Sequence, residues 1–73
     1  MKTPTKSQLT ALAVRALGEG ATVEVFHYDE GSVWVGRAQA GDASEDVYSE
    51  MRSKARVVRA LAAALGALAE VRK

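Results

Sequence analysis

Cysteine is absent from the 73-residue chain, and proline occurs once, at Pro4. Without cysteine the chain can form neither a disulfide framework nor a thiolate zinc site. The chain also contains a single histidine, His27, so a Ser–His or Cys–His nucleophilic centre has no obvious members. The acidic residues lie where turns and helix starts are expected, without the spacing of metal ligands. We therefore expect no catalytic residues, no cofactor and no metal site.

Neither sign of charge is in clear excess, since ten Lys and Arg residues against nine Asp and Glu residues give a formal net charge of +1. With 48% apolar and 26% charged residues, the composition is that of a globular protein and not of a disordered tail. No apolar run is long enough to span a bilayer, and the amino terminus lacks the apolar core of a signal peptide. We expect one small soluble domain that is monomeric and does not associate with membranes.

The first periodic segment predicts a helix over residues 6–17. Thr5 followed by Gln8 has the spacing of a capping box, and Gly18 and Gly20 provide a stop. Between these signals the apolar residues recur at the spacing of an amphipathic helix. They are Leu9, Leu12, Ala13, Ala16 and Leu17.

The period then changes from 3.6 to 2, which predicts strands over 22–28 and 32–39 joined by a three-residue turn over 29–31. In the register that places Tyr28 opposite Ser32, one face of this hairpin is aromatic and the other is formed by valines. The aromatic face consists of Phe26, Tyr28 and Trp34, and the valine face of Val23, Val25, Val33 and Val35. We expect the valine face to be buried, although the aromatic face is the alternative.

The last third of the chain predicts one long helix over residues 43–71. Asp42 and Glu45 have capping-box spacing, and no proline interrupts the segment. Apolar residues follow at helical spacing, namely Val47, Met51, Val58, Leu61, Leu65 and Leu68. The predicted architecture is an α+β fold in the order helix, strand, strand, helix (αββα).

Two groups of residues are candidates for binding a partner. The first is the aromatic hairpin face of Phe26, Tyr28 and Trp34, which is either part of the core or an exposed site for protein recognition. The second is a row of arginines on one flank of the last helix: Arg52, Arg56 and Arg59. This row is either a solvated helix face or a docking face for an acidic partner.

Three segments, KTPTKSQLTALAVRALGEG, VEVFHYDEGSVWVGR and RALAAALGALAEVRK, resemble a small transcription regulator of a Xanthomonas bacteriophage. The resemblance implies a protein of the host bacterial cytoplasm that binds the β and β′ subunits of host RNA polymerase. It further implies inhibition of initiation by displacement of the σ factor, and antitermination. In this hypothesis the aromatic hairpin face binds a polymerase subunit, and the arginine row guides the encounter electrostatically.

A small nucleic-acid-binding domain is the alternative, because the order of elements is similar to that of double-stranded RNA-binding domains. Three expectations speak against it. The chain has one strand too few, Glu45 and Asp46 replace lysines at the start of the last helix, and no aromatic residue is interleaved with the arginines. We therefore expect no sequence-specific binding of nucleic acid. A phage antagonist of another host complex is a further alternative.

Overall fold

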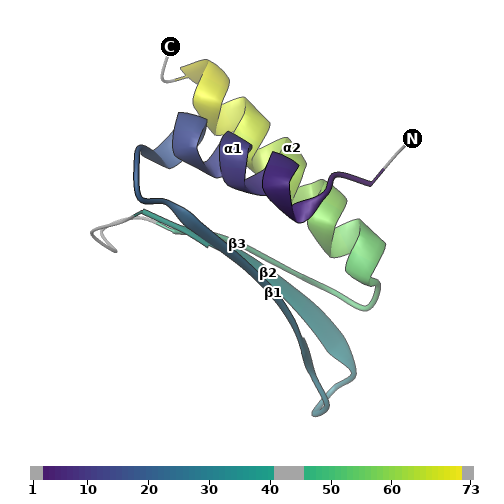
Figure 1. Ribbon diagram of the computed structural model, residues 1–73. Helices are drawn as coiled ribbons and strands as arrows, with labels where there is room; N and C mark the ends of the chain where they lie inside the picture. The colour runs from purple at the N-terminus through teal and green to yellow at the C-terminus, as the bar shows by residue number, and fades with distance from the viewer. Residues whose placement is uncertain (1–2, 41–45, 72–73) are drawn as a thin grey trace.

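The computed structural model of the chain describes residues 3–40 and 46–71. Three antiparallel strands form a sheet, and two helices pack on one face of it (Figure 1). The elements are α1 (Lys6–Leu17), β1 (Thr22–Tyr28), β2 (Val33–Gln39), β3 (Asp46–Met51) and α2 (Lys54–Val71). The strand order is β1-β2-β3, so β2 is the central strand. The predicted α+β class is confirmed, but the order of elements is α-β-β-β-α and not αββα.

The first helix begins and ends where the sequence predicts. The backbone N–H of Gln8 donates to Thr5 Oγ1 at 3.2 Å, and the backbone N–H of Thr5 donates to Gln8 Oε1 at 2.8 Å. This reciprocal pair satisfies two backbone donors that the first turn of a helix leaves without partners. Gly18 follows the helix with a φ of 105°, a conformation that glycine adopts without steric cost. The capping box therefore forms and sets the start of α1.

The predicted long helix over 43–71 is wrong, because its first part forms β3. Residues 46–51 pair antiparallel with β2, with Val47 opposite Ala38 and Ser49 opposite Gly36. Three strands give β2 a partner on both edges, whereas an isolated two-stranded hairpin is marginally stable. The helix begins only at Lys54, where the backbone N–H of Arg56 donates to Ser53 Oγ at 3.4 Å. The expected capping box of Asp42 and Glu45 lies outside the described residues.

The predicted hairpin register is also wrong, by one residue. The connection has four residues, 29–32, and the Ser32 N–H donates to the Asp29 carbonyl oxygen at 3.3 Å. Tyr28 consequently lies opposite Val33, and β2 begins at Val33 and not at residue 32. Since successive side chains of a strand point to opposite faces, this shift exchanges the face of every β2 side chain.

The shift divides both predicted faces of the hairpin. We name the helix-covered side of the sheet the inner face and the opposite side the outer face. Trp34 lies on the inner face opposite His27, whereas Phe26 lies on the outer face opposite Val35. The valine face is likewise divided, with Val23 and Val25 on the inner face and Val33 and Val35 on the outer face.

The second helix contacts the sheet closely at Gly36, in the middle of β2. A Cβ atom built on Gly36 would lie 2.7 Å from Val57 Cγ1 and 3.3 Å from Leu61 Cδ2. A glycine at this position therefore lets α2 approach the strand more closely than any other residue would allow. Around this contact lies the main cluster of buried apolar residues: Leu9, Ala13, Ala16, Ala21, Val23, Ala38, Val58, Leu61, Leu65 and Ala69.

Gly36→Ala should lower the free energy of unfolding by about 1 to 3 kcal/mol, because the added methyl group overlaps the Val57 side chain. Urea unfolding followed by circular dichroism measures the change. Gly66→Ala is the matched control, since nothing lies within 4 Å of its added Cβ in α2, and it should stabilise the helix by about 1 kcal/mol. A Gly36→Ala variant as stable as the original protein would contradict this account of the contact.

Candidate functional site

The outer face of the sheet has no helix over it (Figure 1) and carries two of the predicted aromatic residues. The rings of Phe26 and Tyr28 meet edge to face, with centroids 5.1 Å apart. Tyr28 is 52% exposed, and Tyr48 on β3 is 55% exposed. Val35 is nevertheless fully buried, because the side chains of its neighbours on the three strands close over it. The outer face is therefore a layer of large side chains that is open to contact.

Polar groups on the outer face are predominantly acidic. Glu24, Asp46 and Glu50 lie on the two edge strands, whereas Arg37 lies on the central strand between Glu24 and Tyr48. The Tyr48 hydroxyl donates to Glu50 Oε2 at 2.6 Å, and this hydrogen bond raises the pKa of Tyr48 above its usual value of 10.0. The Nε atom of Arg37 is buried without a hydrogen-bond partner. Three carboxylates against one guanidinium make this surface acidic.

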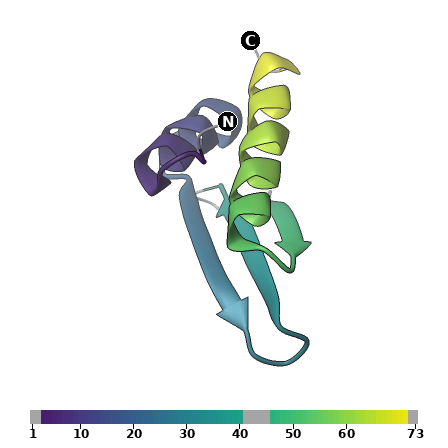
Figure 2. The same ribbon diagram turned by 90° about the vertical axis from the view of Figure 1, so that its right-hand side faces the viewer.

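The opposite charge gathers at one end of the molecule, where both helices begin. The two helices run in the same direction (Figure 1), and Figure 2 shows the molecule from the side of their first turns. Lys6 lies in the first turn of α1 and Lys54 in the first turn of α2, and neither first turn contains an acidic residue. A helix start carries partial positive charge and usually attracts carboxylates. Here lysines add to that charge, which favours an anion at this end.

Trp34 lies at this cationic end and not with Phe26 and Tyr28. The Lys54 Nζ atom lies 5.4 Å from the centroid of the Trp34 ring, within the range of a cation–π interaction. The His27 ring on β1 also lies beside Trp34, with the two ring centroids 5.0 Å apart. His27 Nδ1 in turn lies 3.4 Å from Asp29 Oδ1. An aromatic side chain is thus placed among the basic residues, in contrast to the prediction.

The three predicted arginines are all exposed, and two of them flank the start of α2. Arg52 precedes the Ser53 cap and Arg56 follows it, and both line one surface hollow together with Met51 and Ser53. Arg59 lies further along α2, where its Nε atom donates to the Ala55 carbonyl oxygen at 3.3 Å. Arg52 and Arg56 are thus predicted from the sequence, whereas Lys6 is not. The position of Lys6 directly after the Thr5 cap is the signal that could have revealed it.

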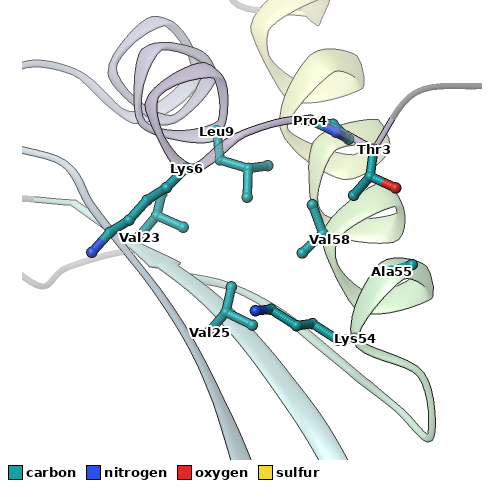
Figure 3. A pocket seen from close by; sticks show the side chains of 9 residues that line it. All are labelled: Thr3, Pro4, Lys6, Leu9, Val23, Val25, Lys54, Ala55 and Val58. Atoms are coloured by element: carbon teal, nitrogen blue, oxygen red, sulfur yellow. The ribbon is translucent and has the colours of Figure 1, made fainter.

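A groove opens between the starts of the two helices, above β1 (Figure 3), and we name it the helix-start groove. Its volume is about 530 Å³, and both first-turn lysines lie along it. The lining residues are Thr3, Pro4, Lys6, Leu9, Val23, Val25, Lys54, Ala55 and Val58. Because none of them is acidic, the positive charge of the helix starts is not neutralised within the groove.

No protein-family model, curated protein or solved structure matches the chain. Within residues 3–40 and 46–71, no helix has the length and apolar character needed to cross a membrane. Over the same residues, no three His, Asp or Glu side chains gather in a group that could hold a metal ion. The cationic end and the outer face are therefore the two candidate functional surfaces.

Proposed function

We propose that the protein binds double-stranded RNA through the end of the molecule at which both helices begin. The observation that carries the proposal is the pair of parallel helix starts, each with a lysine and no acidic residue in its first turn. Backbone N–H groups and the helix dipole make such starts suitable for phosphate groups. Arg52 and Arg56 extend the same positive surface beside Lys54.

Three features of the structure differ from the expectations that spoke against nucleic acid. A third strand, β3, is present, so the sheet is not one strand short of the sheet in double-stranded RNA-binding domains. The last helix begins at Lys54 between Arg52 and Arg56, and not at an acidic segment. An aromatic ring lies against one of the basic residues, since Trp34 lies beneath Lys54. The first two findings have one origin, since residues 46–51 form β3 and α2 therefore begins at Lys54. The position of Trp34 is a separate observation.

Double-stranded RNA is the favoured form of nucleic acid for two reasons. The order α-β-β-β-α with both helices on one face of the sheet is the order of double-stranded RNA-binding domains. Such domains recognise the shape and phosphates of the A-form helix without reading much sequence, which agrees with the expected lack of sequence specificity. Asp29 and Glu30 at the exposed hairpin turn repel phosphates, so we expect contact at the helix starts alone and a footprint below about 16 base pairs.

Removing one phosphate-binding cation should lower both the affinity for RNA and its salt dependence. We expect Lys54→Gln and Arg56→Gln each to reduce the slope of log affinity against log salt by about 1, because each loses one phosphate contact. Fluorescence anisotropy with a labelled RNA duplex measures this between about 50 and 200 mM salt. Arg15→Gln is the matched control, since Arg15 is exposed in the last turn of α1, at the opposite end.

The RNA proposal fails if the protein does not bind the duplex at the lowest salt. It also fails if Arg15→Gln reduces the slope as much as Lys54→Gln does, because the attraction would then come from overall charge and not from the helix starts.

The outer face favours a second candidate function, the one that the resemblance implies. In this proposal a phage-encoded regulator binds the β and β′ subunits of RNA polymerase in the host cytoplasm, displaces the σ factor and acts as an antiterminator. The exposed rings of Tyr28 and Tyr48 and the adjacent Phe26 support it, because aromatic side chains dominate the binding energy of protein interfaces. The predicted aromatic face included Trp34. In the structure the outer face carries Tyr48 instead.

Tyr28→Ala should weaken polymerase binding by more than about 2 kcal/mol if its ring is a hot spot. Surface plasmon resonance with immobilised core polymerase measures the affinity. The matched control is Val71→Ala, which truncates an apolar side chain that is 82% exposed near the end of α2. Native-like amide shifts must accompany the loss. A folded Tyr28→Ala variant that binds polymerase at full strength would exclude the outer face as the site.

A further inference from the structure

We propose that the helix-start groove binds an aliphatic carboxylate, that is, an anion with an apolar chain. This ligand goes beyond RNA binding, because it would occupy the apolar interior of the groove and not only the positive surface around it. The proposal depends on three observations: an apolar floor, cations without acidic neighbours at the rim, and walls that offer no backbone pairing.

The floor of the groove is apolar and is open between the two helices. In Figure 3 the side chains of Leu9 and Val58 extend into the space from α1 and α2, and Val25 extends towards it from β1. Leu9 and Val58 are almost completely buried, whereas Val25 is only half-buried. A volume of about 530 Å³ lies within the range of small-ligand sites in proteins, roughly 300 to 1,000 Å³. An aliphatic chain in this space would cover the accessible part of Val25, because Leu9 and Val58 have little surface left to cover.

Two lysines line the groove, and one of them, Lys54, extends its ammonium group into it (Figure 3). In Figure 3 the Lys54 side chain extends towards Val25, while the Lys6 side chain extends past Val23. Lys54 is exposed and contacts the Trp34 ring, but it forms no ion pair with a described carboxylate. None of the described residues that line the groove is acidic. An anionic head group near Lys54 would therefore meet an ammonium donor and two helix starts of the same sign.

The walls explain why the occupant is a small amphiphile and not a peptide strand. The lining residues of α1, α2 and β1 present side chains from within helices and from the inner face of the sheet. A peptide that adds to a sheet needs the free edge of a strand for its backbone hydrogen bonds. The free edge of β1 lies in the plane of the sheet, whereas Val23 and Val25 line the groove from the inner face. A peptide paired with that edge would therefore lie beside the groove, and the groove itself suits a ligand whose only polar part is its head group.

Decanoate is the probe, and Trp34, the only tryptophan of the chain, is the reporter because it contacts Lys54. Below its micellar concentration, decanoate should change the Trp34 emission and shift the methyl signals of Val23, Val25 and Val58 in NMR spectra. Decyltrimethylammonium, with the same chain and the opposite charge, should bind at least about tenfold more weakly, as expected for the loss of a charge-assisted hydrogen bond.

The Lys54→Met variant keeps the length of the side chain and removes its charge. It should reduce the affinity for decanoate by about tenfold, as judged from the Val25 methyl shift, since the substitution itself alters the Trp34 environment. Arg15→Met is the matched control and should leave the affinity unchanged. Because no RNA is present, this experiment can fail while the RNA proposal holds, and the reverse is also true.

Three results would overturn the proposal. Equal affinities for decanoate and decyltrimethylammonium would show that the charges at the rim do not select the ligand. Methyl shifts at Val33 or Val71 instead of Val25 would place the ligand elsewhere. Shifts of Val25 that follow protein concentration without any ligand would identify a second copy of the chain as the occupant.

Discussion

The close contact between α2 and Gly36 is the constraint on which the rest of the structure depends. Gly36 lets Val57 and Leu61 lie against the central strand. Lys54 precedes Val57 by one helical turn, and Trp34 precedes Gly36 by two residues on the same face of β2. The contact that positions α2 on the sheet therefore also places the first turn of α2 over Trp34. One packing requirement thus brings a cation, an aromatic ring and a helix start to the same end of the molecule.

The local signals of the chain predicted α1, β1 and the pairing of β1 with β2, but not the register of that pairing. The start of α1 follows from a hydrogen-bonded pair only three residues apart, which a sequence can specify directly. The register of the hairpin depends instead on how many residues its turn contains. Asp-Glu-Gly suits a three-residue turn, yet Ser32 also adopts a positive φ, of 50°, and extends the turn to four residues. The additional turn residue shifts the register by one, so Trp34 lies on the inner face, whereas Phe26 and Tyr28 lie on the outer face.

The third strand was missed because its apolar residues fit two periods at once. Val47 and Met51 are four residues apart, which suits a helix, but they also share one face of a strand with Ser49. Pairing with the second edge of β2 favours the strand over the helix. This pairing is a tertiary contact, which the local spacing of apolar residues does not reveal. The error concealed the true start of α2 at Ser53 and Lys54. As a result, the basic helix start, on which the functional proposal now depends, was not recognised from the sequence.

Charge is unevenly distributed over the fold, with lysines and arginines at the helix starts and carboxylates on the outer face of the sheet. If the cationic end is the functional surface, an NMR titration of the labelled protein with a short RNA duplex should change the shifts of Lys6, Lys54, Arg56 and the Trp34 indole and leave the outer face unaffected. Changes centred on Phe26, Tyr28 and Tyr48, or none at all at low salt, would contradict this expectation.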